Sequence, residues 1–323
     1  MKRVSLLLLL TLISQFINAQ YTEIINSKSP GFSESPYSIG TNVFQFETGL
    51  FYRSSNNEAV LARPSIFGGD LFFRYGKFKE RLEFNVNISY QKDEVIGDLD
   101  SRYHLSGISD LTIGAKYLFY EQGYADKSKE IRSWKRRVAF DKKRLIPSIA
   151  VYGGVHTNYF VKENFLTKDS FVDSLYYEDG FSYKGAVLLQ HDFTDRLVVL
   201  TNLIADRISS ENQFYSYIVT MTYAINQQWS FFFENQGKYK SKSSPQYQFG
   251  TGLAYLFSPD LQINASARTN LFDNYSYMYM ATGISLRIDR HQDEIVYKKS
   301  SRKSSIKPKR KGFFSRLFGK KRN

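Results

Sequence analysis

The sequence predicts an all-β protein, a twelve-stranded antiparallel transmembrane β-barrel with an N-terminal signal peptide and a basic C-terminal tail. Three observations predict this fold class. Twelve segments alternate apolar and polar residues with a period of two, which is typical of strands with one apolar face. Aromatic residues make up 16% of the chain, as the aromatic girdles of an outer-membrane barrel require. The chain also begins like a secreted protein.

The amino terminus has the layout of a signal peptide. Lys2 and Arg3 precede an apolar run over residues 4–16, and the small residue Ala19 follows it. This run is shorter than the roughly 20 residues that a membrane-spanning helix needs. We therefore expect residues 1–19 to be cleaved, and an uncleaved membrane anchor is the alternative.

Composition excludes several other classes of protein. Beyond the leader, no stretch of even a dozen residues lacks polar side chains, which excludes a helical membrane protein. A mean hydropathy of -0.39 is still compatible with a barrel, because lipid-facing and lumen-facing residues alternate. Cysteine is absent, so disulfides, thiolate nucleophiles and cysteine-based metal sites are excluded. The net charge of +13 resides almost entirely in the leader and the tail, which argues against a nucleic-acid-binding domain.

Twelve strands are expected from the alternation. It is clearest over residues 81–91, where apolar residues at even positions oppose polar residues at odd positions. Each segment is long enough for a tilted membrane strand, and an even number suits a bacterial barrel. The predicted strands are 42–53, 66–77, 80–92, 108–121, 145–158, 181–193, 196–207, 212–225, 228–240, 245–257, 260–270 and 275–288.

Connection lengths predict the orientation. Outer-membrane barrels have short periplasmic turns and longer external loops. The connections after predicted strands two, six, eight and ten are short, which indicates an outer-membrane protein with both termini in the periplasm. The basic connection over 122–144 is a long exception, either a short helix or a disordered excursion.

A soluble β-sandwich is the alternative fold, since secreted sandwiches also contain alternating strands. It would have to cover rows such as Trp229, Phe231 and Phe233 with a second sheet. The barrel, whose outer face meets lipid, needs no such cover.

Three segments carry a family resemblance: SPGFSESPYSIGTNVFQFETGLFY, SDLTIGAKYLFYE and FGTGLAYLFSPDLQINASARTNLFDNYSYMYMATGISLRI. With these segments the chain resembles the family of outer-membrane transporters labelled "MetA-pathway of phenol degradation". The resemblance covers 29–288 and implies a barrel and a role in transport. The basic connection and the tail depart from the family pattern.

The segment before the barrel is expected to lie outside the barrel wall, and a plug is one interpretation of it. Pro30 and Pro36 bracket polar residues that cannot join a strand ladder, so this segment could lie within or beneath the lumen. The predicted organisation is a signal peptide over 1–19, this periplasmic segment over 20–41, the barrel over 42–288, and a basic periplasmic tail over 289–323.

Charged residues of both signs fall on the inner face of the predicted strands. They could set the selectivity of a narrow pore, or they could pair with one another and fill the interior. Phe51, Phe72 and Phe232 share that face and favour a filled or ligand-lined interior over a wide aqueous channel. The candidate lumen residues are Glu47, Asp70, Arg74, Glu83, Lys116, Glu234, Arg268 and Arg287.

Catalysis is not expected. The four histidines are His104, His156, His191 and His291, and no serine lies in a recognisable nucleophile motif. The histidine spacing matches no metal site, so no metal and no cofactor are expected.

The tail is predicted to contain a short amphipathic helix. A basic amphipathic helix binds a membrane surface, and the anionic cell wall or a periplasmic protein are alternative partners. A solvated disordered tail is the simpler interpretation, and nucleic acid is excluded by the compartment. The candidate residues are Lys307, Lys309, Arg310, Lys311, Phe313, Phe314, Arg316, Leu317 and Phe318.

Two functions follow from these predictions. The first is a channel or transporter, in contact with outer-membrane lipid, for a small solute that is aromatic or amphipathic. The second is a closed scaffold barrel that docks a periplasmic partner, the cell wall or the inner leaflet through its tail.

Overall fold

A computed structural model describes most of the chain between Ile25 and Arg290. The described residues are 25–29, 31–57, 63–96, 102–123, 141–157, 159, 165–166, 175–176, 180–210, 212–241, 244–270 and 275–290. The predicted signal peptide and the amphipathic part of the tail lie outside these residues.

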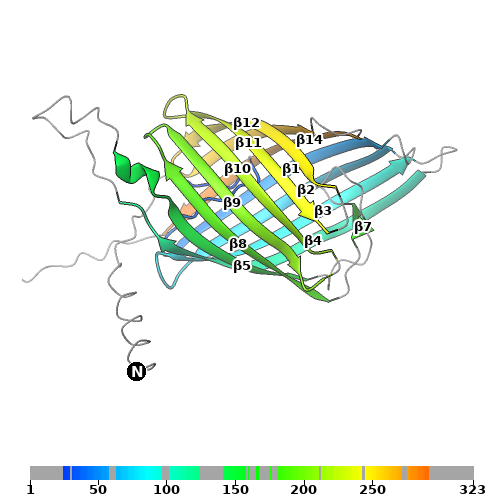
Figure 1. Ribbon diagram of the computed structural model, residues 1–323, viewed down its shortest axis with the longest axis horizontal. Helices are drawn as coiled ribbons and strands as arrows, with labels where there is room; N and C mark the ends of the chain where they lie inside the picture. The colour runs from blue at the N-terminus through cyan, green and yellow to red at the C-terminus, as the bar shows by residue number, and fades with distance from the viewer. Residues whose placement is uncertain are drawn as a thin grey trace, which may run out of the picture. The chain divides into compact units, whose positions relative to one another are not determined.

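Twelve antiparallel strands form a closed barrel (Figure 1). Each strand pairs with its neighbours along the chain, and β1 pairs with β14 from Val43↔Asp289 to Asn57↔Tyr275, which closes the cylinder. This confirms the predicted barrel and excludes the sandwich. The barrel strands are β1 (Val43–Asn57), β2 (Arg63–Gly76), β3 (Leu82–Ile96), β4 (Arg102–Tyr120), β5 (Ser148–Thr157), β8 (Phe181–Asp192), β9 (Leu197–Ile208), β10 (Phe214–Ala224), β11 (Trp229–Lys240), β12 (Gln246–Ser258), β13 (Leu261–Asn270) and β14 (Tyr275–Asp289).

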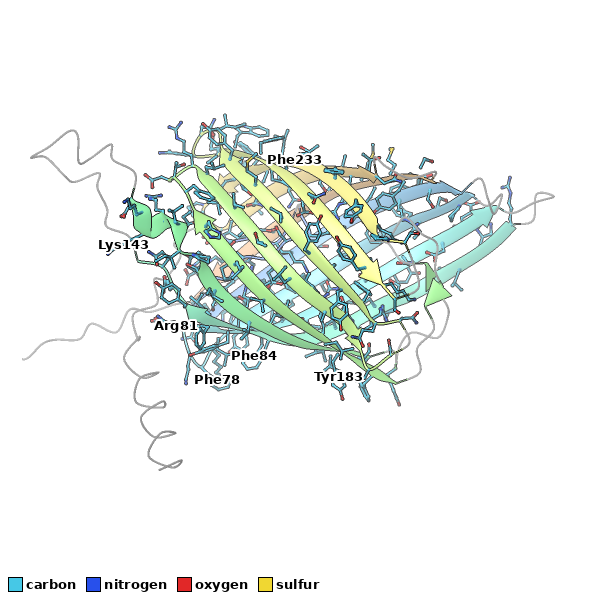
Figure 2. The ribbon with its side chains drawn as sticks, viewed as in Figure 1. Phe78, Arg81, Phe84, Lys143, Tyr183 and Phe233 are labelled. Carbon is cyan, nitrogen blue, oxygen red and sulfur yellow. The ribbon has the colours of Figure 1, made fainter. Side chains whose placement is uncertain are left out.

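The two faces of each strand differ in the way the alternation predicts. In β1, Phe46 and Leu50 point outward and are 37% and 56% exposed, whereas Glu47 and Phe51 point inward and are 2% exposed. Outward side chains such as Phe233 surround the barrel in Figure 2. An exposed apolar surface of this kind is stable against lipid, and the inner face then provides the polar interior.

The β3–β4 hairpin is longer than predicted. Its strands meet beyond residue 92, where Asp93 pairs with Leu105 and Glu94 pairs with His104, in a segment that we expected to be a loop. The polar composition suggested a loop, but strands that extend past the bilayer can be polar on both faces. The connection between β5 and β8 contains another unpredicted feature, the two-stranded sheet of β6 (Phe165–Leu166) and β7 (Leu175–Tyr176).

The segment that begins at Ile25, the end of β14 and the short turns lie at the same end of the barrel, called here the terminal end. Its connections include the turns over 193–196, 225–228 and 259–260. The end of the basic connection forms the 3-10 helix η2 (Lys142–Leu145), where the Asp141 side chain accepts a hydrogen bond from the backbone N–H of Lys143. Residues 124–140 lie outside the described residues. Within the described part of the chain, no helix has the length and apolar character to cross a membrane.

Candidate solute-binding site

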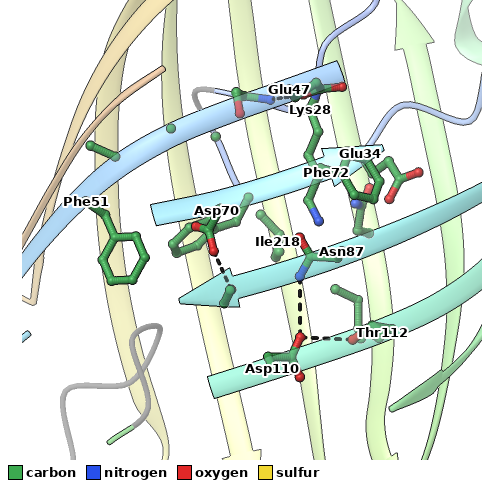
Figure 3. A pocket seen from close by; sticks show the side chains of 18 of the residues that line it. Lys28, Glu34, Glu47, Phe51, Asp70, Phe72, Asn87, Asp110, Thr112 and Ile218 are labelled. Atoms are coloured by element: carbon green, nitrogen blue, oxygen red, sulfur yellow. Dashed lines mark hydrogen bonds between the residues drawn. The ribbon is translucent and has the colours of Figure 1, made fainter. Parts of the chain in front are cut away.

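A cavity of about 270 Å³ lies inside the barrel. Its lining comes from inward-facing residues of most strands and from the segment over 25–41, which precedes β1 (Figure 3). The lining therefore mixes charged, polar and aromatic side chains. Among the described residues, no group of three or more His, Asp or Glu side chains is placed to hold a metal ion.

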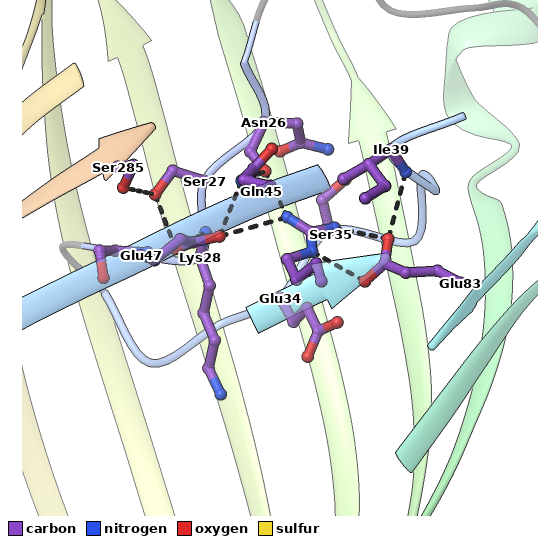
Figure 4. A network of polar contacts seen from close by, with 12 residues as sticks. Asn26, Ser27, Lys28, Glu34, Ser35, Ile39, Gln45, Glu47, Glu83 and Ser285 are labelled. Carbon is purple, nitrogen blue, oxygen red and sulfur yellow. Dashed lines mark hydrogen bonds and ion pairs between the residues drawn. The ribbon is translucent and has the colours of Figure 1, made fainter. Parts of the chain in front are cut away.

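The segment over 25–41 contacts inward-facing side chains of the barrel near its terminal end (Figure 4). It begins where the backbone N–H of Ile25 donates to the carbonyl oxygen of Pro259, at 2.8 Å. It contributes many small polar residues and no strand to the ladder. Its backbone N–H groups consequently need acceptors inside the barrel.

Buried carboxylates of the barrel supply these acceptors. The backbone N–H groups of Lys28 and Ser29 donate to Glu47 Oε2 at 2.9 and 3.1 Å. The N–H groups of Phe32 and Ser33 donate to Glu234 Oε2 at 3.1 and 3.2 Å.

A third carboxylate repeats the arrangement. The backbone N–H of Ile39 donates to Glu83 Oε2 at 3.1 Å. Glu47, Glu83 and Glu234 lie on β1, β3 and β11 and are each at most 2% exposed, so they hold the segment from different sides of the lumen. Hydrogen bonds to charged acceptors of this kind are about twice as strong as neutral ones.

Each of the three carboxylates also has a cationic partner on the barrel. Arg74 donates to both oxygens of Glu83, with Nε–Oε1 at 2.7 Å and Nη2–Oε2 at 2.9 Å. Its Nη1 lies 3.4 Å from Glu47 Oε1, and Arg268 forms an ion pair with Glu234. These pairs compensate charges whose burial would otherwise be costly.

Glu34 adds a carboxylate from the segment itself. Its Oε1 lies 3.1 Å from Lys116 Nζ, which is also 3.5 Å from Glu83 Oε2. Burial by itself would raise the pKa of Glu34, but the charges of Lys116, Lys28 and Arg74 oppose this effect and lower the pKa to about 2. Glu34 therefore stays ionised and binds the segment to the wall of β4.

A band of hydrogen-bonded polar side chains, called here the aspartate band, crosses the wall of the cavity. His156 joins two of its aspartates, with Nδ1 3.1 Å from Asp110 Oδ1 and Nε2 2.6 Å from Asp206 Oδ1. The band consists of Asp70, Ser89, Asn87, Asp110, Thr112, His156, Asp206 and Lys184. It extends over six strands, from β2 to β9, and about half of the barrel wall.

Aromatic rings line much of the remaining wall. The rings of Phe51 and Tyr279 stack with centroids 5.8 Å apart, and the ring of Phe32 meets Tyr279 edge-on at 5.4 Å. Arg268 lies over the Phe32 ring, with Cζ 3.5 Å from its centroid. The cavity thus presents a polar band on one side and ring faces on the other, which suits a solute with one polar and one apolar part.

The sequence-predicted lumen residues fall into four sets. Seven of the eight are at most 6% exposed, and Asp70 is half-buried at the cavity. Glu47, Arg74, Glu83 and Lys116 form one network, and Asp70 belongs to the aspartate band. The pair of Glu234 with Arg268 is separate, and Arg287 lies apart, 2.9 Å from Asp289.

Sequence reasoning missed several residues of the site. Asp110 shares the parity of Lys116 in β4, so extending that face along the strand would have found it. Lys184 and Asp206 are harder to detect, because apolar residues occupy both faces of β8 and β9 and the alternation is weak there. His156 lies on β5, where the inner face also carries Ala150 and Tyr152, so the alternation is weak in that strand too.

Similar folds occur among solved channels. The COG4313 outer membrane channel from Pseudomonas putida F1 is 10% identical with a TM-score of 0.55, and the match covers 78% of this chain and 97% of that one. The CymD monoaromatic hydrocarbon channel is 10% identical with a TM-score of 0.46, covering 87% and 98%. A search of curated proteins gave no match.

The family comparison reaches from the N-terminal segment to the end of β14. The model of the family described as "Putative MetA-pathway of phenol degradation" matches residues 27–288. The match includes Lys28 and the three carboxylates that hold the segment. The chain therefore belongs to this family of outer-membrane β-barrels, as its sequence resemblance predicted.

Proposed function

We propose that the chain is an outer-membrane channel for a small amphipathic or aromatic solute, which passes through the cavity in the lumen. The observation that carries the proposal is the cavity itself, about 270 Å³ inside a closed barrel, with a polar band and aromatic rings in its wall. An apolar cavity of about 150 Å³ already binds benzene in another protein. The volume is therefore sufficient for a solute with one ring.

The segment over 25–41 is proposed to act as a plug. Its contacts with Glu47, Glu83 and Glu234 place backbone where a solute would have to pass. Each carboxylate would keep a barrel cation if the segment moved, so its movement would leave no buried charge unpaired. We infer that the solute passes when this plug is displaced.

The orientation is part of the proposal. The short turns, the start of β1 and the end of β14 at one end of the barrel support a periplasmic terminal end. The long connection over 121–147 at that end is the exception. A protease added to intact cells should then cleave within 158–180 and leave 193–196 intact.

The test compares the full mature chain with a variant that lacks residues 25–41, both in planar bilayers and in liposomes loaded with solute. We expect small or rare conductance steps from the full chain and larger, longer steps from the variant. Heat-dependent mobility in gels controls for folding of the variant. Absence of conductance and solute flux from both proteins would overturn the channel proposal.

The scaffold function depends on the tail, which lies outside the described residues. No contact in the described part of the chain favours it over the channel. It stays a prediction and is tested by the truncation described below.

A further inference from the structure

The cavity contains an alkylammonium group that belongs to the plug. The backbone N–H of Lys28 donates to Glu47, and its side chain extends from the segment into the cavity (Figure 3). The Nζ atom lies 4.9 Å from the centroid of the Phe72 ring. This geometry lets the negative face of the ring stabilise a cation. The wall of the cavity therefore already accepts a primary ammonium.

The charges of the lining favour a cation at this place. Among the described residues that line the cavity, five carry carboxylates, namely Glu34, Glu47, Asp70, Asp110 and Asp206. The positive groups of the lining are Lys28, Lys184, Arg207 and, when protonated, His156. Lys28 is one of few positive charges there and belongs to the segment, not to the barrel wall. Because Glu34 also belongs to the segment, withdrawal of the plug removes one charge of each sign, and the remaining lining still has more carboxylates than cations.

The aspartate band faces the space that Lys28 enters. Asp110 and Asn87 line the same cavity as Lys28 (Figure 3). The carboxylate of Asp110 is fixed in place because it accepts hydrogen bonds from Asn87 and Thr112 and lies 3.1 Å from His156 Nδ1. A carboxylate held by its neighbours can receive a cationic ligand with little reorganisation.

The side-chain amide of Asn202, in the same cavity, also provides a hydrogen-bond acceptor. Asn202 is 1% exposed and lines the cavity, and its Oδ1 accepts no hydrogen bond from the described residues. Buried polar atoms are paired in most proteins, so an isolated buried acceptor at a cavity indicates a ligand that donates. An ammonium group donates from three N–H bonds and accepts none.

We propose that the cavity binds small organic cations, specifically primary amines that carry a single aromatic ring, and that Lys28 occupies the amine position when the plug is in place. The inference rests on the proposed channel function and names the solute class of that same site. The ammonium would replace Lys28 Nζ above Phe72 and face the aspartate band. The ring would lie against the wall of Phe51 and Tyr279.

The experiment uses three probes with the same ring and different charge: benzylamine, benzyl alcohol and benzoate at pH 7. Calorimetry measures their binding to the full mature chain in detergent, and proteoliposomes measure their flux. We expect benzylamine to bind about tenfold more tightly than benzyl alcohol, and benzoate to bind most weakly. The flux should follow the same order.

Variants distinguish an effect of side-chain charge from an effect of side-chain volume. Lys28→Ala should increase the affinity for benzylamine several-fold and leave benzoate weak, whereas Asp110→Asn should reduce the preference for benzylamine. Asp195→Asn, in an exposed turn where the side chain is 84% exposed, is the matched control and should change nothing. Because the wild-type comparison needs no variant, a folding defect in Asp110→Asn does not decide the result.

Each outcome has a distinct meaning. Equal binding of the three probes, or a preference for benzoate, overturns the cation inference while flux of any probe keeps the channel. If Lys28→Ala increases the affinity for all three probes equally, the Lys28 side chain only fills space in the cavity. This result also overturns the inference. If no probe binds or passes, the channel proposal fails and the cation inference fails with it.

Discussion

Replacing Arg74 with Met tests the buried network that holds the plug. Arg74 is 1% exposed, donates two hydrogen bonds to Glu83, and lies 3.4 Å from Glu47. The change removes the cation and keeps a side chain of similar length. Glu83 keeps Lys116 at 3.5 Å, but Glu47 loses the guanidinium that lies 3.4 Å from it.

The expected loss of folding free energy follows from removing one partner of a buried ion pair and leaving the other partner in place. Loss of one partner from a buried pair costs about 3–5 kcal/mol, and the contact of Lys116 with Glu83 should place Arg74→Met near the lower value. Urea unfolding of the barrel in liposomes, followed by tryptophan fluorescence, measures the loss of stability. Arg196→Met, at an exposed turn, is the control and should stay within about 0.5 kcal/mol of the wild type.

A second change sharpens the test. Adding Glu83→Gln to Arg74→Met removes a carboxylate that the first change leaves without its main cation. The double variant should therefore lose less stability than the sum of the losses in the two single variants. An Arg74→Met barrel as stable as the Arg196→Met control would refute the description of these residues as a paired, buried network.

Three further changes test the plug, the outer face and the tail. The lowered pKa of Glu34 means that its stabilisation of the plug is complete above its ordinary pKa of 4.5 and is lost as the pH falls towards 2. Limited proteolysis should therefore cut 25–41 faster at pH 3 than at pH 7 in the wild type, and a Glu34→Gln variant should show a smaller difference. Phe233→Arg places a charge on the lipid face, where Phe233 is 43% exposed, and should destabilise the barrel by up to about 2–4 kcal/mol in the same urea assay. A similar stability for Phe233→Arg and the wild type would contradict an outer face in lipid. Truncation after Arg290 should weaken binding to anionic vesicles, because each Lys or Arg near such a surface adds about 1 kcal/mol. Unchanged vesicle binding, localisation and partner capture would leave the tail as solvated chain.

Strand number and face could be predicted because they depend on local pattern. Residues 81–91 alternate so regularly that only one register places Phe84 in lipid and Glu83 in the lumen, and both positions are as predicted. The alternation does not mark the ends of strands that continue past the membrane. In β3 and β4 the polar residues after position 92 suggested a loop, although the ladder continues to Ile96↔Arg102.

Which charges meet was not contained in that local pattern. Parity placed Glu234 and Arg268 on the inner face, but their partnership depends on how β11, β12 and β13 are staggered around the barrel. The joining of Asp110 and Asp206 through His156 likewise required β4, β5 and β9 to curve into one wall.

The sequence alone determined the fold class, the number of strands and the face that each side chain takes, because a period of two converts directly into inside and outside. Only the tertiary structure decided that residues 25–41 enter the lumen and that Lys28 reaches Phe72. The physical reason is that backbone N–H groups outside any ladder donate hydrogen bonds to whichever carboxylates the closed barrel brings near them. Closure of the barrel brings together residues that are far apart in the chain, and no local sequence pattern predicts which of them meet.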